Sequence, residues 1–440
     1  MMTPENKKRE IVITGMGAVS PIGTGNDSYR DSLKNGKSGI DHITLFDASK
    51  FSTTFAGEVE GFEPEKILSG LEILNITNER RILLANCAAK LAIDDAALKA
   101  DDFQEAKSGV ILSSGVHAVI PDLKELMDSG IYSSIFNDPN LDPGKFSETV
   151  KKEATGENHF YPLFNRVNAG ALSIASQYKI KGPCYNIISA CAAATQAIGQ
   201  AYHLIQRGEA DILLTGGYDS MVYHFGVYAF SLLELMSKQN HDPAGAMKPF
   251  DKNRDGFALG EGAGILILEE KEHAIKRGAK IYAKMAGYGS SIDAYKITDP
   301  HPEGKGAMLS MQRAIDNAGM KPAQIDYINA HGTATLKNDR IETEAIKKVF
   351  GEKAYNIPVS STKSMIGHLM SAGGALELIA TVLGMENNFI APTINYSEPD
   401  ALCDLDYVPN KSREAEIRTA ISNSFGLGGQ NGTIVVTKDN

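Results

Sequence analysis

The sequence is poor in cysteine, in positive charge and in long apolar runs. Its 440 residues include only 4 cysteines, at positions 87, 184, 191 and 403, and none of them form a CxxC pair. This number and spacing suit neither a disulfide framework nor a zinc site, so we expect a reducing compartment. Lysine and arginine total 44 against 54 acidic residues, a net charge of −10. That balance disfavours a general surface for nucleic acid or for an anionic membrane, and any acidic partner would need a local basic patch.

No apolar run approaches the roughly 18 residues needed to cross a bilayer, and residues 1–10 are polar, without the apolar core of a secretion signal. We therefore expect a cytoplasmic protein with no membrane insertion. Hydrophobic residues make up 42% of the chain, which is enough for a large core. At roughly 150 residues per domain, the length predicts about three domains or two sizeable halves.

Short apolar runs alternate with helix-like stretches along the whole chain, a pattern that predicts an α/β fold with mainly parallel or mixed buried sheets. Glycines end two of the expected helices. The expected strands are residues 11–13, 110–112, 185–188, 211–214 and 265–268, and the expected helices are residues 78–98, 191–207 and 304–318.

The chain has a weak internal similarity. In residues 186–207 and again in residues 358–385, a strand and a turn lead into a helix rich in alanine and glycine and poor in charge. Such helices should be central and tightly packed. We expect two similar halves, residues 10–279 and 280–437, with a surface insertion at about 121–162, where Gly, Pro, Asn and Ser interrupt the rhythm.

Cys191 is the sharpest single candidate for chemistry. It follows an expected buried strand and begins an alanine-rich helix. At such a position free N–H groups and the helix dipole lower a thiol pKa and favour a reactive thiolate. Its alanine neighbours leave room for a substrate beside the sulfur. The alternative interpretation is a small buried hydrophobic residue with no chemical role.

Two histidines stand at strand-to-helix junctions: His331 ends an expected strand, and His368 precedes the second alanine- and glycine-rich helix. Strand carboxyl ends are where α/β folds place chemistry, and two such histidines can hold a carbonyl oxygen that gains negative charge. They can equally be unrelated turn residues satisfied by backbone groups. No third nearby His or Cys in the sequence suggests a metal site.

Lys363 lies five residues before His368, in a Ser/Thr-rich turn beside an apolar segment, where its head group needs a partner. Glu377 on the following helix, or Glu342 or Asp339 after the His331 loop, can supply that partner. The alternative is an exposed lysine solvated by water.

The segment Phe425, Gly426, Leu427 and onward to Gly432 contains four glycines between two expected strands. Such a loop can bring N–H groups close to a ligand or act as a gate, although an ordinary glycine-rich hairpin has the same composition. A separate glycine pair, at 15 and 17, fails as a dinucleotide fingerprint because Ser20 occupies the third glycine's place. We therefore reject an NAD site.

Together these segments resemble the β-ketoacyl-acyl-carrier-protein synthase family, type I/II, from about residue 10 to 437 and in the family's order. Chance would not place so many specific motifs in sequence. The motifs are ITGMG (13–17), SACA (189–192), DKNRDGF (251–257), NAHGT (329–333), STKSMIGH (361–368) and NSFG (423–426).

The resemblance implies a thiolase fold, with two pseudo-symmetric halves in a five-layered α/β/α/β/α arrangement. It also implies a decarboxylative Claisen condensation of acyl and malonyl thioesters, both held on the phosphopantetheine of acyl carrier protein. No further cofactor, metal or ATP is implied. The assembly is expected to be a homodimer, or a heterodimer with a related ketosynthase.

The resemblance also implies roles for single residues. Cys191 resembles the acylated nucleophile, with its own N–H and that of Leu427 as the oxyanion hole. His331 and His368 resemble the pair that stabilises the enolate, and Lys363 resembles the family's electrostatic lysine. The supporting carboxylates are Glu377, Asp339 and Glu342, the gate contains Phe425 and Gly426, and the substrate pocket contains Val116, Thr333 and Thr335.

Three departures from the family pattern bear on specificity. In the gate, Leu427 replaces a usual Phe and Gln430 replaces a usual Thr, which bears on the choice of acyl chain length. The insertion at 121–162 is longer than is usual for type II fatty-acid enzymes, which favours a specialised lipid or polyketide pathway. Around residues 65–81, where relatives present basic residues to the acidic carrier, this chain has only Lys66, Arg80 and Arg81, which predicts a weaker or moved docking patch. Two other functions stay open: a non-catalytic chain-length partner of another ketosynthase, and a decarboxylase that only makes acetyl-carrier, both of which should lack the cysteine.

Overall fold

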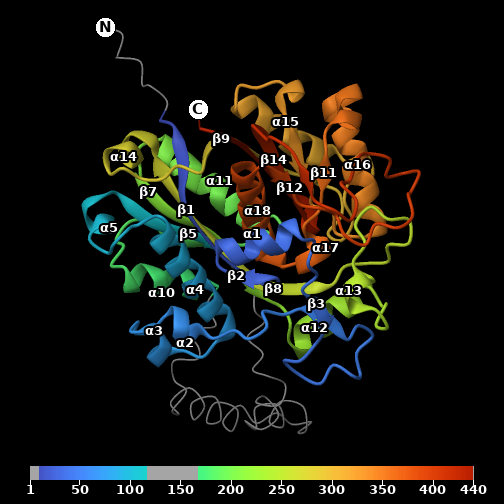
Figure 1. The fold of residues 1–440 in the computed structure, drawn as a ribbon, viewed down its shortest axis with the longest axis horizontal. Helices are drawn as coiled ribbons and strands as arrows, with labels where there is room; N and C mark the ends of the chain where they lie inside the picture. Colours follow the sequence, from blue (N-terminus) through green and yellow to red (C-terminus); the bar gives the residue numbers. More distant parts are fainter. Residues whose placement is uncertain (1–8, 116–166, 440) are drawn as a thin grey trace, which may run out of the picture.

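The computed structural model describes residues 9–115 and 167–439. The expected insertion at 121–162 and the pocket residue Val116 lie outside these ranges. Ten strands follow one another across one continuous sheet (Figure 1). In spatial order they are β11 (Val359–Ser360), β10 (Tyr327–Asn329), β14 (Thr419–Gly426), β15 (Gln430–Thr437), β9 (Ala283–Ile292), β1 (Ile11–Ser20), β8 (Leu259–Glu270), β7 (Ile212–Ser220), β5 (Ser108–Ser113) and β6 (Cys184–Ile187).

The sheet is mixed, which confirms the expected fold class. The strands at its two ends pair in parallel: β5 pairs with β7 and β6 on one side, and β10 pairs with β14 and β11 on the other. The middle strands pair antiparallel. β1 joins the two regions because it pairs with β8 on one edge and with β9 on the other, and every one of its residues is buried.

β1 runs to Ser20, well past the expected residues 11–13. The glycines that follow Ile13 do not end the strand, because they allow helix α4 (Arg80–Asp95) to pack directly on it. A Cβ on Gly17 would lie 2.0 Å from the carbonyl oxygen of Ala88, and one on Gly15 would lie 2.4 Å from that of Ala92. Close approach of backbone to backbone therefore explains these two glycines.

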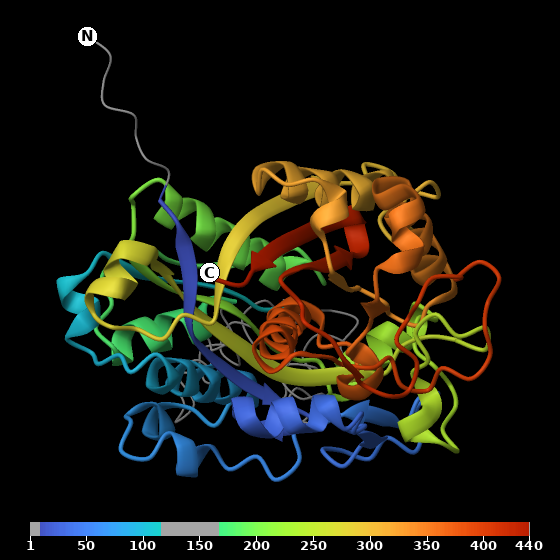
Figure 2. The same ribbon diagram turned by 45° about the horizontal axis from the view of Figure 1, so that its top comes forward.

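The helices and the two halves of the sheet form the expected five layers. α4 and α10 (Ala169–Gln177) pack on one outer face, and α15 (Lys305–Asn317) and α16 (Leu336–Phe350) lie on the other side. Between the two halves of the sheet lie α11 (Ala193–Gln206) and α18 (Gly373–Asn387), in contact with each other and with strands of both regions (Figure 2). These are the two helices rich in alanine and glycine, and their central, buried position confirms the expectation.

The remaining elements are short and lie around this frame. None of the helices in residues 9–115 and 167–439 is long and apolar enough to cross a membrane. The helices are α1 (Asn26–Lys34), α2 (Pro64–Ile67), α3 (Ile73–Ile76), α5 (Asp102–Glu105), α12 (His224–Leu232), α13 (Pro243–Ala246), α14 (Lys271–Lys276) and α17 (Lys363–Ile366), with 3-10 turns η1 (Pro322–Gln324), η2 (Gly351–Asn356), η3 (Met370–Ala372) and η4 (Leu427–Gly429). The short strands are β2 (Gly23–Thr24), β3 (Ile40–His42), β4 (Phe55–Gly57), β12 (Phe389–Ile390) and β13 (Arg413–Glu414).

Candidate active site

Cys191 stands in a tight turn between β6 and α11, two residues before the helix begins. The preceding residue, Ala190, has a φ of 48°, a left-handed conformation that costs a non-glycine residue about 1–2 kcal/mol. This strained turn places the buried Cys191 at the edge of the core, where it lines the floor of a cavity. The position of the cysteine was predicted from the sequence, but the strain at Ala190 has no sequence marker because alanine rarely adopts this conformation.

Two loops from the other half of the chain hold the histidines. His331 follows β10, and the carboxylate of Glu342, on α16, accepts the backbone N–H groups of His331 and Gly332 at 2.9 and 2.8 Å. His368 follows α17, and its own N–H donates to the carbonyl oxygen of Ala258 at 2.8 Å. Both histidine backbones are therefore fixed before any substrate arrives.

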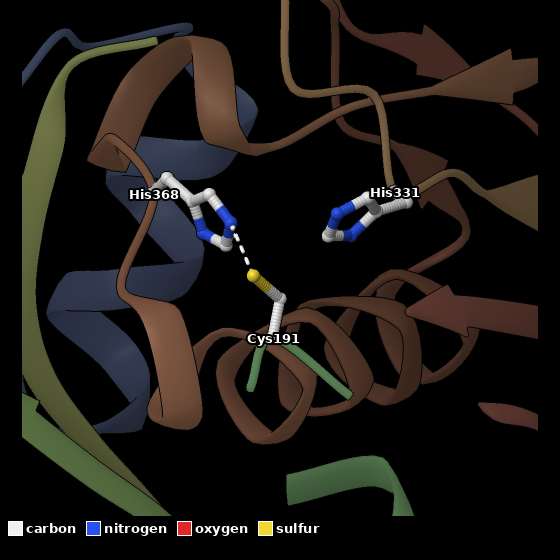
Figure 3. A group of neighbouring side chains, drawn as sticks. All are labelled: Cys191, His331 and His368. Carbon is white, nitrogen blue, oxygen red and sulfur yellow. Dashed lines mark hydrogen bonds between the residues drawn. The ribbon is translucent and has the colours of Figure 1, made fainter. Parts of the chain in front are cut away.

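The fold brings the cysteine and both histidines together around one cavity (Figure 3). Nε2 of His368 lies 3.1 Å from Sγ of Cys191. The two imidazole rings have centroids 5.4 Å apart and stand nearly perpendicular, at 82°. All three side chains are buried.

Hydrogen bonds identify which ring nitrogen carries the proton. The backbone N–H of Met370 donates to Nδ1 of His368 at 3.3 Å, and the ammonium of Lys363 lies 3.3 Å from Nδ1 of His331. Both Nδ1 atoms therefore act as acceptors, so Nε2 carries the hydrogen in each ring. Burial, together with the positive charge of Lys363, holds the pKa of each histidine well below its ordinary value. The site thus presents two neutral N–H donors.

Lys363 is fully buried and takes Glu377 as its ion-pair partner, one of the three carboxylates expected for it. Its ammonium also donates to the carbonyl oxygen of His331 at 2.7 Å. The solvated alternative is therefore wrong. Asp339 acts elsewhere, because its carboxylate accepts the N–H of Phe250 at 2.7 Å and lies 3.8 Å from the guanidinium of Arg254.

The thiol of Cys191 does not have the lowered pKa that its place before a helix predicts. Burial raises its pKa to about 11, although Lys363 and the N–H groups of Leu427 and Cys191 act in the opposite direction. Desolvation of the thiolate outweighs the helix terminus because the sulfur is almost entirely enclosed by protein. That enclosure depends on segments far away in the chain and cannot be read from the local sequence.

A cavity of about 630 Å³ opens in front of the three side chains. Thr333 and Thr335, predicted for the substrate pocket, line it, and their hydroxyl groups lie 3.0 Å apart. Phe425, Gly426 and Leu427 line it too. The remaining predicted residues of the described part of the chain are buried and do not line the cavity: Lys363, Glu377, Asp339 and Glu342. Lys363 and Glu342 contact His331, and Glu377 acts through Lys363.

The glycine-rich segment is a hairpin between β14 and β15 that lies over the cysteine. A Cβ on Gly426 would come within 3.0 Å of the backbone nitrogen of Cys191. Beyond Leu427 the hairpin is hydrogen-bonded to a second loop. The N–H of Gly428 donates to the carbonyl oxygen of Ile297 at 2.6 Å, and the carbonyl oxygen of Gly429 accepts the N–H of Asp293 at 2.9 Å. The hairpin therefore forms one wall of the cavity directly above the sulfur.

The three side chains also form a potential metal-binding group that the sequence did not reveal. Sγ of Cys191 and one ring nitrogen each of His331 and His368 all lie within 4.8 Å of one another. Thiolate and imidazole are the ligands that zinc takes in proteins. The absence of a further His or Cys near the two histidines in the sequence does not carry over to the fold, because folding brings the distant Cys191 to them. That no metal is bound stays a prediction.

The basic residues expected to form a docking patch are mostly interior or already paired. Arg80 forms an ion pair with the buried Glu261, and Arg81 is buried. Lys66 is exposed but is paired with Glu63 one helical turn away. This arrangement agrees with the weaker docking patch predicted from the sequence.

A five-layered α/β fold with a cysteine and two histidines around one cavity is the arrangement of thiolase-fold condensing enzymes. The sequence matches the family described as "Beta-ketoacyl synthase, N-terminal domain" over residues 8–274 and "Beta-ketoacyl synthase, C-terminal domain" over residues 282–397. The chain therefore belongs to the β-ketoacyl synthase family, as its motifs indicated.

Named relatives agree with this assignment. The chain is 41% identical to 3-oxoacyl-[acyl-carrier-protein] synthase 2 of Synechocystis sp., over 98% of this chain and 99% of the relative. It resembles the solved structure of a type II PKS acyl-carrier protein in complex with its ketosynthase, with a TM-score of 0.85, 33% identity and coverage of 99% and 100% of the two chains. The ishigamide ketosynthase/chain length factor gives a TM-score of 0.83, also at 33% identity, over 98% and 100%.

Proposed function

We propose that this chain is a 3-oxoacyl-acyl-carrier-protein synthase, which condenses an acyl group held on Cys191 with malonyl-acyl carrier protein. The observation that carries the proposal is the pair of neutral Nε2–H donors, from His331 and His368, beside a cysteine at the floor of one cavity. Two neutral donors at one point suit the oxygen of a thioester that becomes an enolate. Imidazolium ions or general bases would suit a different reaction.

In the first half-reaction, Sγ of Cys191 attacks the carbonyl carbon of the acyl thioester. The carbon–sulfur bond to phosphopantetheine breaks, and the thiol proton of the cysteine ends on the departing phosphopantetheine sulfur. The N–H groups of Cys191 and Leu427 both face the sulfur and serve as the oxyanion hole. The step as proposed requires no metal or further cofactor.

In the second half-reaction, malonyl thioester places its carbonyl oxygen between the two histidines. The bond to the carboxylate breaks, CO₂ leaves, and the electron pair forms an enolate held by both Nε2–H groups. The enolate carbon attacks the acyl thioester, and the thiolate of Cys191 departs. Lys363 keeps Nδ1 of His331 in the acceptor role through its hydrogen bonds, and Glu377 balances its charge.

Two structural proposals accompany this function. The two halves are residues 10–279, which supply the nucleophile, and residues 280–437, which supply both histidines and Lys363.

The second proposal concerns assembly. β6 ends the sheet and pairs, in the described ranges, only with β5. Beside it Ile188 is 49% exposed. A free strand edge next to an apolar residue suits a second copy of the chain, or a related ketosynthase such as the chain length factor named above.

The proposed compartment is the cytoplasm, which fits four free thiols. The alternative function, a non-catalytic chain-length partner, is disfavoured by the assembled site because such a protein needs neither the cysteine nor the oriented histidines. Carrier-bound acyl groups in fatty-acid, lipid or polyketide synthesis are all compatible with the cavity.

Intact-protein mass spectrometry tests the proposal. Incubation with acyl-carrier should add one acyl group to the chain, and Cys191→Ala should abolish that addition while Cys184→Ala retains it. Adding malonyl-carrier should then release CO₂ and yield a 3-oxoacyl-carrier. Lack of acylation would support the chain-length partner, and CO₂ release without chain extension would support a simple decarboxylase.

A further inference from the structure

The walls of the cavity are acidic apart from one lysine. Among the described residues that line it, Glu234, Asp255, Asp293 and Asp299 carry carboxylates, and Lys337 is the single lysine or arginine. The two histidines at the floor are neutral at pH 7, because their pKa values lie well below the ordinary range. Among the lining residues of 9–115 and 167–439, an anion entering this cavity therefore meets one permanent positive charge.

Lys337 lies at the amino-terminal end of a helix, which adds to its positive charge. It is in the first turn of α16, a helix of 15 residues whose N-cap is Thr335, and its side chain is 66% exposed. The amino-terminal end of a helix carries a partial positive charge that favours an anion. Thr335 lines the same cavity, so Lys337 stands at its open end with the catalytic cysteine at its floor.

The present partner of Lys337 is easily exchanged. Its ammonium lies 2.5 Å from a carboxylate oxygen of Asp299, on the loop that supports the gate hairpin. Exposed ion pairs are weak because water competes for both charges. Asp299 also lies 3.8 Å from the ammonium of Lys296, so it keeps a cation when Lys337 turns away.

We propose that Lys337 binds the phosphate of the phosphopantetheine arm at the mouth of the cavity, by exchanging its contact with Asp299 for one with the phosphate. This rests on the proposed function, which supplies a substrate with a thioester at one end of an arm and a phosphodiester at the other. With the thioester at Cys191, the phosphodiester lies toward the open end, where Lys337 is the one lysine or arginine among the described residues that line the cavity. An ammonium acts there as a point charge on a phosphate.

The test compares substrates that differ only in the phosphate. Malonyl-phosphopantetheine and malonyl-pantetheine are assayed for CO₂ release, together with malonyl-carrier and malonyl-coenzyme A, which separate a carrier-bound from a free phosphate. Lys337→Ala should raise KM for every phosphate-bearing substrate by about two- to fivefold, because an ion pair at an exposed site contributes little. KM for malonyl-pantetheine should not rise, and Lys337→Arg should restore binding.

Two further variants isolate the effect. Lys296→Ala removes the same charge from the same partner, Asp299, but Lys296 does not line the cavity. KM for phosphate-bearing substrates should therefore rise much less than in Lys337→Ala, and only because Asp299 then holds Lys337 more firmly. Asp299→Asn should lower KM for phosphate-bearing substrates, because it removes both the competing partner and a repelling charge. An equal rise in KM with and without the phosphate in Lys337→Ala, or an unchanged KM for the carrier-bound substrate, would overturn the proposal.

Calorimetric binding of phosphopantetheine and of pantetheine, without any reaction, separates this proposal from the proposed function. If the enzyme releases no CO₂ but binds phosphopantetheine more tightly in a Lys337-dependent way, the function fails and the phosphate site stands. If the enzyme is active but binding of the two compounds is equal, the phosphate site fails and the function stands.

Discussion

Nε2 of His368 lies 3.1 Å from Sγ of Cys191, although 177 residues separate the two along the chain. The contact has a defined polarity, because Met370 donates its N–H to the opposite ring nitrogen of His368. The imidazole therefore offers a hydrogen to the sulfur and cannot take the thiol proton through Nε2. This distinguishes the site from a cysteine–histidine pair in which the ring acts as the base.

Removing either histidine side chain should separate the two half-reactions. His331→Ala and His368→Ala should each lower the rate of malonyl decarboxylation by about 100- to 1000-fold, the usual cost of losing one oxyanion donor. Self-acylation of Cys191 should persist, since its oxyanion hole is made of backbone N–H groups. Release of labelled CO₂ and intact mass report the two steps, with His42→Ala, on the distant strand β3, as control. Normal CO₂ release by either variant would remove the histidines from the enolate site.

The reactivity of the free enzyme should rise steadily with pH. Because burial raises the thiol pKa of Cys191 to about 11, the reactive thiolate is a minor species at neutral pH. Its alkylation by iodoacetamide should accelerate about tenfold per pH unit between about pH 7 and 9, since only the thiolate reacts. Cys191→Ala gives the background from the partly exposed Cys184. A rate that levels off below about pH 8 would show a lowered pKa instead.

The buried ion pair between Lys363 and Glu377 should stabilise the fold only as a pair. Lys363→Met leaves a carboxylate buried without a cation and should cost about 3–5 kcal/mol in urea unfolding, while Lys363→Met with Glu377→Leu should recover most of that loss. Lys66→Ala, which breaks an exposed pair, should cost no more than about 1 kcal/mol. A double variant as unstable as the single one would contradict this expectation.

Leu427 should set acyl selectivity at the gate. It lines the cavity between Gly426 and Gly428, and leucine fills less volume than phenylalanine. Leu427→Phe should therefore lower kcat/KM for long or polyunsaturated acyl-carriers relative to short ones. Short-chain condensation should persist, because the N–H at 427 survives the substitution. Competition kinetics measure the ratio, and an unchanged ratio would rule out Leu427 as the selectivity gate.

Much of the site was predictable because its residues stand at the junctions of recognisable elements. Cys191, His331 and His368 each follow a strand or begin a helix in the sequence, and the motifs around them are specific. The thiol pKa was predicted in the wrong direction, since enclosure of the sulfur depends on distant segments. The left-handed Ala190 and the N–H that Met370 gives to His368 leave no local mark in the sequence.

The first strand was predicted too short for a related reason. Its apolar run ends at Ile13, whereas Gly15 and Gly17 lie inside β1 and admit the backbone of α4. A glycine that permits close packing and one that permits chain reversal look alike in a single sequence, because only the neighbouring helix decides between them.

The place of β1 also constrains how the chain is made. It leaves the ribosome well before its two long neighbours in the sheet, β8 and β9, whose residues paired with β1 extend to Glu270 and Met285. At about 5–20 residues per second, this strand, which is buried along its whole length, waits roughly tens of seconds for its neighbours. Fragments of the chain that end before β9 should therefore be prone to aggregation and dependent on chaperones, and neither half should be obtainable in soluble form alone.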